Sequence, residues 1–345
     1  MLITLEENEE QFHRYYITDC AVRSKDMFVF LADRRYTDEE VAEEEENGSD
    51  FAYRDKRAVT YFRQKPPAAQ WFGTLYEGHG YMLVGAAEKP LNQCIAIDRS
   101  EDYLSAIGSG IFDEENLAPP LPNNPDRGGI RKIKTLNGYA YVCGGNRSFG
   151  KRLGKEQWFS HNDSIPHVKG AGRDEGFDDF DGFSESDIYA AGGKGDVWHY
   201  DGNAWRQIPF PTNSWVKSVC CGGDGQVYIS CYEGLTFMGR EDRWKKIYSG
   251  GIPLGWTDMV WYEDRVWCTN ENGLWTIHEG KVTYASDLPS EITVCSGSLY
   301  VNDGVMLLAG MGGAAFRENG QWHSIFLSGS LEKALRNQRK EKSGS

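Results

Sequence analysis

Short apolar runs alternate with turn residues along most of the chain, and this pattern predicts an all-β protein. The runs are rich in Val, Ile, Tyr and Trp, and each is closed by Gly, Asp or Asn. In the clearest stretch, residues 215–248, four runs follow one another as WVKSVCC, QVYISCY, LTFMGR and RWKKIY. No apolar run reaches the roughly 20 residues of a membrane helix, so we expect no membrane partner.

The four-run unit repeats about every 40 residues. Its second run begins at Ile188, Val227, Val266 and Met306, which gives spacings of 39, 39 and 40 residues. Weaker copies over residues 130–158, 71–103 and 15–62 bring the count to seven. A period near 40 with four strands per period is the signature of a β-propeller blade. The sequence therefore predicts a seven-bladed β-propeller, or a six-bladed one, with four antiparallel strands in each blade.

We expect one propeller domain over residues 1–327, because blades bury their faces only by packing around an axis. The segment Leu2-Ile3-Thr4-Leu5 is expected to add a strand to the last blade and close the ring. An acidic insertion interrupts the first unit near residues 37–50. The basic tail, residues 328–345, is expected to be disordered or helical, with disorder the usual state of a terminus.

Propeller topology assigns the loops to two faces. If the strands are named a to d from the axis outward, the d–a and b–c loops share one face and the tight a–b and c–d turns share the other. The d–a and b–c loops here are longer and more varied in sequence. Since function usually resides on variable loops over a rigid scaffold, we expect the binding face there.

Net charge points to a basic partner. The chain has 37 Lys and Arg against 51 Asp and Glu, a formal net charge of −14. This sign disfavours binding to a nucleic-acid backbone and suits a cationic protein. Eight acidic residues lie within 13 positions between Asp38 and Asp50. They form either a solvated, partly disordered loop or a surface that attracts a cationic partner.

A second acidic cluster lies in the approach to the innermost strand of the fourth unit, interleaved with Phe177, Phe180 and Phe183. It is interpreted as a partner-binding rim, as ordinary turn chemistry beside core phenylalanines, or as a site for a hard cation, although no EF-hand pattern supports a metal. Trp215 and Trp256 open two successive blades and are either blade-packing residues or exposed anchors. The candidate partner-binding residues are Asp174, Glu175, Asp178, Asp179, Asp181, Trp215, Glu233, Trp256 and Glu271.

The cysteines and the N-terminus indicate a cytoplasmic protein. The eight cysteines are scattered without a C-x-x-C pair, which fits buried free thiols rather than a disulfide framework or a zinc site. The first twelve residues carry four glutamates where a signal peptide needs positive charge and then an apolar run. We expect no metal and no cofactor, and a monomer in the absence of its partner.

Motifs for catalysis are absent from the sequence. It contains no G-x-S-x-G elbow and no H-E-x-x-H, and the segment from Gly145 to Lys151 only approximates a phosphate-binding loop, since Arg152 replaces the Ser or Thr. We therefore expect a non-enzymatic protein, and no catalytic residue is assigned.

The segments GFDDFDGFSESDIYAAGGKGDVWHYDGNAW (residues 176–205) and DLPSEITVCSGSLYVNDGVMLLAGMGGAAF (residues 287–316) resemble bacterial propeller proteins associated with antibacterial effectors of the type VI secretion and Rhs class. The resemblance covers residues 130–325 and implies the fold and an immunity role. In that role the chain binds and neutralises a toxin, and some relatives resemble inhibitors of nuclease toxins. No set of functional residues carries over from the family.

The leading hypothesis is thus a non-catalytic propeller that binds a cognate antibacterial toxin, with an acidic face covering the nucleic-acid site if the toxin is a nuclease. One alternative is a cytoplasmic scaffold or assembly factor. The other is a propeller hydrolase or lyase acting on a carbohydrate-like substrate.

Overall fold

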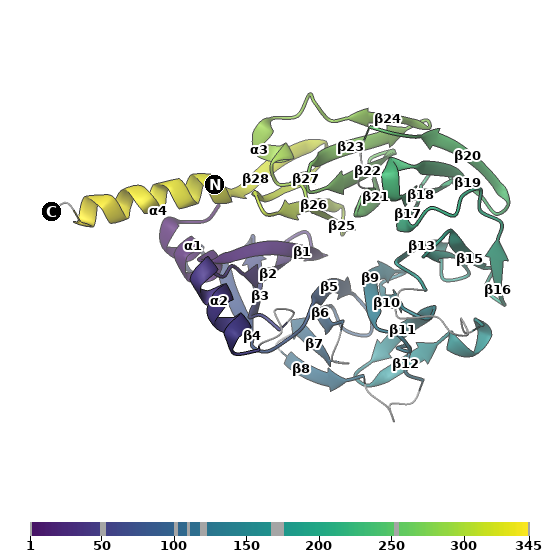
Figure 1. Cartoon of the computed structure of the whole chain (residues 1–345), viewed down its shortest axis with the longest axis horizontal. Helices are drawn as coiled ribbons and strands as arrows, with labels where there is room; N and C mark the ends of the chain where they lie inside the picture. The colour runs from purple at the N-terminus through teal and green to yellow at the C-terminus, as the bar shows by residue number, and fades with distance from the viewer. Residues whose placement is uncertain are drawn as a thin grey trace. The chain divides into compact units, whose positions relative to one another are not determined.

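Seven four-stranded antiparallel sheets follow one another along the chain (Figure 1). The computed structural model describes residues 2–48, 53–99, 103–108, 111–117, 123–166, 176–251 and 255–343. Each sheet is built from four consecutive strands, and the fold is a seven-bladed β-propeller. The prediction of seven blades is confirmed, and the six-bladed alternative is wrong.

The chain divides into two units, which are described separately. The first, here called unit 1, comprises Met1–Gly80, Glu271–Gly273 and Ala285–Ser345, and the second, unit 2, comprises Tyr81–Asn270 and Leu274–Tyr284. Unit 1 holds the first blade, β1 (Tyr15–Ser24), β2 (Met27–Arg34), β3 (Lys56–Phe62) and β4 (Trp71–Tyr76), and the last, β25 (Ser298–Asn302), β26 (Val305–Gly310), β27 (Gly313–Glu318) and β28 (Gln321–Leu327). It also holds α1 (Leu5–Phe12), α2 (Asp38–Glu46), α3 (Ser290–Thr293), α4 (Ser328–Ser343) and the short helix η1 (Pro67–Ala69).

The other five blades belong to unit 2, apart from Gly273 of β23. The first two are β5 (Met82–Ala87), β6 (Gln93–Asp98), β7 (Tyr103–Gly108), β8 (Ile111–Asn116), and β9 (Ile130–Leu136), β10 (Tyr139–Gly144), β11 (Ser148–Gly154), β12 (Gln157–Ser160). The next is β13 (Asp179–Ser184), β14 (Asp187–Gly192), β15 (Asp196–Tyr200), β16 (Trp205–Ile208). The last two are β17 (Val216–Cys221), β18 (Val227–Cys231), β19 (Thr236–Arg240), β20 (Arg243–Tyr248), and β21 (Asp258–Tyr262), β22 (Arg265–Asn270), β23 (Gly273–His278), β24 (Lys281–Tyr284). Two short helices lie in the connections of unit 2, η2 (Asn162–Ser164) after β12 and η3 (Tyr232–Gly234) after β18.

The boundary between the first two repeats was placed wrongly. Trp71 is not the start of the second unit but the first residue of β4, the fourth strand of the first blade, where it pairs with Tyr61 of β3. The reason is α2, which lies in the connection from Arg34 to Lys56 and lengthens the first repeat. The second blade starts only at Met82.

The first and last blades are joined by packing between blades. The expected extra strand at residues 2–5 is wrong, because a helix begins at Leu5. Thr4 and Glu7 form a capping box, in which the Thr4 hydroxyl accepts a bond from the Glu7 N–H (3.2 Å) and the Glu7 carboxylate accepts one from the Thr4 N–H (2.8 Å). Leu2 N–H still donates to the Ile325 carbonyl (2.7 Å). Inside unit 1, β1 then packs against β25 and β26.

Tight turns join several neighbouring strands. Glu263 and Asp264, between β21 and β22, have φ of 50° and 61°, and Asn319 and Gly320, between β27 and β28, have φ of 51° and 77°. Positive φ at both central residues is the requirement of a type I′ turn, whose twist matches that of the flanking strands. These a–b and c–d turns leave the longer b–c and d–a connections to carry exposed side chains.

Two segments outside the blades form helices: the acidic insertion, for which a loop was one expectation, and the tail, which was expected to be disordered or helical. The acidic insertion contains α2, and Thr37 and Glu40 form a second capping box at its start. The tail after the last blade forms α4, in which Leu331 and Leu335 are buried. Among the described residues, no helix is long and apolar enough to cross a bilayer.

Candidate partner-binding surfaces

The acidic cluster of the fourth repeat begins beside a buried aromatic core. Phe177 and Phe180 are buried, and the Phe180 ring lies 5.1 Å from that of Phe149. Side chains alternate between the two faces of a strand, so Asp179 and Asp181 face away from Phe180. The candidate residues Asp174 and Glu175 lie outside the described residues. Of the five acidic candidates in this cluster, the structure thus describes Asp178, Asp179 and Asp181.

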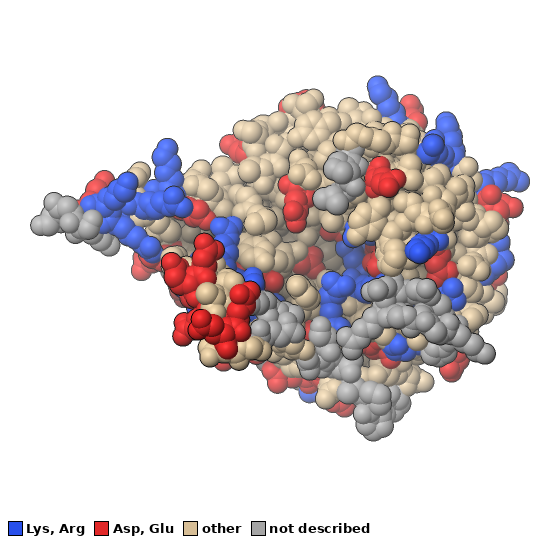
Figure 2. Space-filling model, viewed as in Figure 1, with Lys and Arg blue, Asp and Glu red and all other residues tan. Residues whose placement is uncertain are grey.

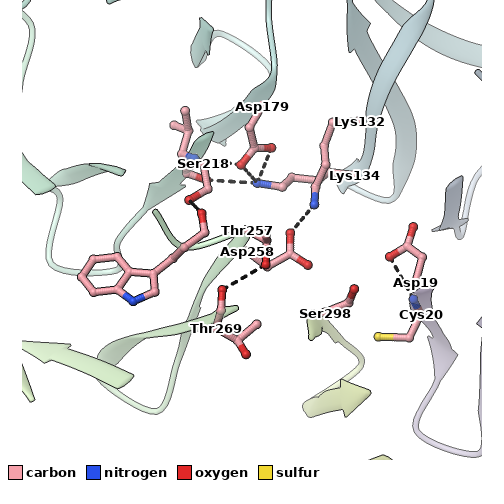
Figure 3. A network of polar contacts seen from close by, with 12 residues as sticks. Asp19, Cys20, Lys132, Lys134, Asp179, Ser218, Thr257, Asp258, Thr269 and Ser298 are labelled. Atoms are coloured by element: carbon pink, nitrogen blue, oxygen red, sulfur yellow. Dashed lines mark hydrogen bonds and ion pairs between the residues drawn. The ribbon is translucent and has the colours of Figure 1, made fainter. Parts of the chain in front are cut away.

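Asp179 is buried and paired with a lysine of the preceding blade (Figure 3). Its carboxylate lies 2.8 Å from the ammonium of Lys134 on β9, which also donates to the Val219 carbonyl of β17 (3.0 Å). The same carboxylate accepts a hydrogen bond from the Val219 N–H (2.8 Å). One aspartate thus links three consecutive innermost strands of unit 2.

Asp181 repeats this contact two residues further along. Its carboxylate accepts a hydrogen bond from the Cys221 N–H (2.8 Å). Strand β17 has only β18 as a neighbour in its own sheet, so its other edge carries N–H groups that need acceptors. The D-x-D spacing of β13 matches the two-residue spacing of these N–H groups. Asp179 and Asp181 therefore join blades.

The charged groups around Lys134 shift one another's pKa values. Burial opposes the charge of Lys134, but the Asp179 and Asp181 carboxylates beside it raise its pKa overall. Burial raises the pKa of Asp181, against the stabilising effects of Lys134 and of the Cys221 N–H. A second ion pair joins Lys132 of β9 to Asp258 of β21, a strand of the blade three further along the chain (Figure 3). Both lysines are thus held in ion pairs between blades of unit 2.

Asp178 and Trp215, two of the candidate residues, are in contact. The Trp215 indole N–H donates to the Asp178 carboxylate (2.9 Å), which also pairs with Arg131 (3.0 Å) and accepts from the Gly193 N–H (3.1 Å). With three donors around it, Asp178 has little unsatisfied negative charge to offer. Its contacts fix the half-buried Trp215 at the loop that enters β17.

Trp256, the second tryptophan candidate, lies in the core. It is 1% exposed, and its ring packs 5.8 Å from Tyr248 and 6.2 Å from Trp275. Its carbonyl accepts a hydrogen bond from the Ser218 hydroxyl (2.8 Å). In the free chain Trp256 therefore presents no surface to a partner, and its contacts are those of blade packing.

The b–c connection after β18 exposes an aromatic and an acidic side chain. Tyr232 is 38% exposed, and Glu233, in the left-handed region at φ 61°, is also exposed. The Lys217 ammonium lies 4.9 Å from the Tyr232 ring centre, and the Tyr232 N–H donates to the Trp215 carbonyl (2.8 Å). These contacts form one patch, called here the Trp215–Tyr232 patch, which consists of Trp215, Lys217, Tyr232 and Glu233. Glu271 is exposed in the turn between β22 and β23.

Exposed negative charge in unit 1 gathers on α2. Figure 2 shows acidic side chains gathered over this helix. Glu39, Glu43 and Glu46 are exposed and follow the i, i+4, i+7 spacing of one helix face. Glu40 turns inward, and hydrogen bonds from Arg14 and from the Thr37 backbone lower its pKa to about 2. The helix thus presents a negative surface on the b–c connection of the first blade.

Burial disfavours the thiolate form of at least five cysteines. Burial raises the pKa of the Cys231 and Cys295 thiols to about 12, and it also raises the pKa values of Cys143, Cys220 and Cys268 well above the ordinary value. Across the described ranges, no group of three or more His, Cys, Asp or Glu side chains is arranged to hold a metal ion.

Sequence reasoning missed several features of these surfaces. Lys134 was not considered, because nothing in the sequence links it to Asp179, 45 positions away. The helix α2 had a signal that was overlooked, the T-x-x-E capping box at Thr37 and Glu40. The same signal at Thr4 and Glu7 marks α1.

Comparison with known proteins gives one relative with an immune function. No protein-family model matches the chain. Over 204 residues, 58% of this chain, the sequence is 27% identical to the immune protein Tsi7 of Pseudomonas aeruginosa, and the match spans 66% of the length of that protein. This similarity agrees with the immunity-type resemblance inferred from the sequence. The association with type VI secretion and Rhs effectors stays a prediction.

Solved structures share the fold. The WD40 propeller of Doa1 aligns with a TM-score of 0.56 at 13% identity, covering 91% of this chain and 97% of that one. YCF48 from Cyanidioschyzon merolae aligns at 0.56 and 11%, covering 88% and 95%. Virginiamycin B lyase of Staphylococcus aureus aligns at 0.54 and 12%, covering 71% and 83%. At such identities the likeness concerns the fold alone, because one fold hosts many functions.

Proposed function

We propose that this protein is a non-catalytic immunity protein that binds and neutralises a cognate antibacterial toxin in the cytoplasm of the producing cell. The observation that carries the proposal is the similarity to the immune protein Tsi7 over 204 residues. A propeller suits the role, because it holds many variable loops on a rigid scaffold.

The charge distribution favours a basic toxin as the target. The chain carries a formal net charge of −14, and α2 exposes Glu39, Glu43 and Glu46. Complementary charge accelerates association and disfavours wrong partners. A nuclease is the toxin class that this charge suits best, since it must present a cationic groove to phosphate. The acidic face of α2 would then lie over that groove.

The Trp215–Tyr232 patch is proposed as a second contact with the toxin. Exposed tyrosines are frequent hot spots of protein interfaces, and the Trp215 and Lys217 contacts hold Tyr232 in place. Association would depend on α2, whereas the lifetime of the complex would depend more on Tyr232.

Co-expression tests the proposal. The chain is expressed in bacteria together with the toxin-like gene encoded beside its own, and growth and co-purification are measured. We expect the wild-type chain to restore growth and the triple variant Glu39→Lys, Glu43→Lys, Glu46→Lys to fail.

A matched control carries the same charge change on the c–d turns, as Glu241→Lys, Asp242→Lys, Glu279→Lys, and we expect it to restore growth. The variant Tyr232→Ala should co-purify more weakly than wild type. A wild-type chain that neither restores growth nor retains the toxin would contradict the proposal.

A further inference from the structure

A cavity of about 300 Å³ lies in unit 1 between α1, α4 and the connection from β2 to α2. Its lining includes four arginines and one carboxylate, namely Arg14, Arg35, Arg336, Arg339 and Glu332. A positive cavity is unexpected in a chain of net charge −14. The cavity is separate from the acidic face of α2 and from the Trp215–Tyr232 patch.

Two of the four arginines are already neutralised. Arg14 is hydrogen-bonded to Glu40, and Arg339 of α4 pairs with Glu9 of α1 at 2.7 Å. These pairs connect the helices that form the walls of the cavity. They leave Arg35 and Arg336 as the guanidinium groups available to a ligand.

Arg35 and Arg336 share a single carboxylate. Glu332 lies 3.4 Å from Arg35 and 3.7 Å from Arg336, both longer than the roughly 2.7–2.9 Å of a strong charge-assisted hydrogen bond. One carboxylate between two guanidinium groups leaves one positive charge in excess. This arrangement suits one additional oxyanion, which a guanidinium binds through two parallel N–H donors.

The remaining wall is largely aromatic. Phe12, Tyr15, Tyr16, Tyr36 and Phe326 line the cavity, and the rings of Phe12 and Phe326 lie 4.8 Å apart. The Arg35 guanidinium lies 5.7 Å from the centre of the Tyr16 ring. Apolar walls with a few convergent polar groups are the usual composition of small-molecule sites, and the volume is at the lower end of their range.

We propose that this cavity binds a small organic acid. Its oxyanion head would lie between Arg35 and Arg336 and its flat apolar body against the tyrosine and phenylalanine rings. Because Arg35 precedes α2 and Arg336 belongs to α4, the ligand would add to the connection that Glu332 makes between these two elements. Binding would therefore also raise the melting temperature of the full chain.

Calorimetric titration of the full-length protein tests this site. The probes are phenyl phosphate and phenylacetate, which differ in the anionic head, with benzyl alcohol as the neutral analogue. We expect saturable binding of at least one anion, and the tighter of the two identifies the preferred head group. Benzyl alcohol should bind at least about tenfold more weakly, since it has no charge for the arginines.

Four variants distinguish a built site from general attraction. Arg35→Gln and Arg336→Gln should each weaken anion binding about tenfold or more, and Glu332→Gln should tighten it, because it frees both guanidinium groups. Arg206→Gln, an exposed arginine of unit 2, should leave the affinity unchanged. The melting temperature of each variant confirms that it folds.

Three results would overturn the proposal. They are the absence of saturable binding of both anions, an unchanged affinity in the double variant Arg35→Gln, Arg336→Gln, and an equal loss of affinity in Arg206→Gln.

Discussion

The two acidic clusters of this chain look alike in the sequence and differ in the structure. At the start of β13, Asp178, Asp179 and Asp181 are enclosed by cations and backbone N–H groups of unit 2. On α2, Glu39 and Glu43 are exposed. The first cluster joins blades, whereas the second gives unit 1 a negative surface.

The difference follows from the neighbours of each carboxylate in the chain. On β13 the aspartates alternate with Phe180, whose burial turns Asp179 and Asp181 toward the edge of β17. In α2 only Val41 and Ala42 are apolar, so little of the helix is drawn into a core. Acidic composition alone therefore does not identify a binding surface.

The largest expected effect is at Asp179. The variant Asp179→Asn should lower the free energy of unfolding by about 3–5 kcal/mol, because it leaves the Lys134 ammonium buried without its partner. Urea unfolding measures the change, and Glu43→Gln on α2 is the exposed control, expected within about 0.5 kcal/mol. Adding Lys134→Met to Asp179→Asn should recover part of the loss. Equal effects of Asp179→Asn and Glu43→Gln would remove the distinction between the two clusters.

The second largest expected effect is the pH dependence of folding stability that arises from His161, a buried residue of unit 2. Burial lowers the pKa of His161 to about 4, and its Nδ1 accepts a hydrogen bond from the Trp205 indole (3.3 Å), which protonation of that nitrogen would break. Because the folded pKa lies below the unfolded value of about 6.5, stability is complete above pH 6.5 and falls between pH 6.5 and 4. The loss should be about 3 kcal/mol.

Urea unfolding of wild type and His161→Gln at pH 7 and pH 4 isolates this contribution. Between pH 7 and pH 4, the free energy of unfolding of the variant should fall by about 3 kcal/mol less than that of wild type. Glu40, with its folded pKa of about 2, contributes equally to wild type and variant and therefore cancels in this comparison. Parallel pH profiles of wild type and variant would contradict the assignment.

A smaller effect on stability is expected from acidic residues in a tight turn, which differ from those on β13 and α2. Glu263 and Asp264 occupy the two left-handed positions of the turn between β21 and β22 without a glycine. The double variant Glu263→Asn, Asp264→Gly should stabilise the chain by about 1 kcal/mol, because these residues adopt positive φ at lower cost. A thermal or urea unfolding midpoint that falls below wild type would show that the acidic side chains have another role.

The sequence predicted the architecture well and the site only in part. The seven blades followed from strand starts such as Val227 and Val266, which recur because each blade solves the same packing problem. The first repeat was misplaced at Trp71, because α2 interrupts the period. The partners of Asp179 could not be predicted, since Lys134 and Val219 meet it only after three blades have packed.

The smallest expected effect on stability is at α2. Reversing the charge of Glu39, Glu43 and Glu46 to Lys should change the free energy of unfolding by no more than about 0.5 kcal/mol, because all three side chains are exposed. Urea unfolding checks this, and a larger loss would mean that α2 supports the fold of unit 1. A normal stability makes the triple variant a clean probe of binding.

The most direct test of the account is the association rate between the purified chain and the toxin encoded beside it, measured by biolayer interferometry at low and high salt. We expect the α2 triple reversal to slow association about tenfold or more at low salt and to weaken its salt dependence. The matched reversal at Glu241, Asp242 and Glu279 should leave the rate within about twofold of wild type, because an exposed patch outside the contact contributes little to steering. No binding by the wild-type chain, or equal slowing by both reversals, would contradict the account.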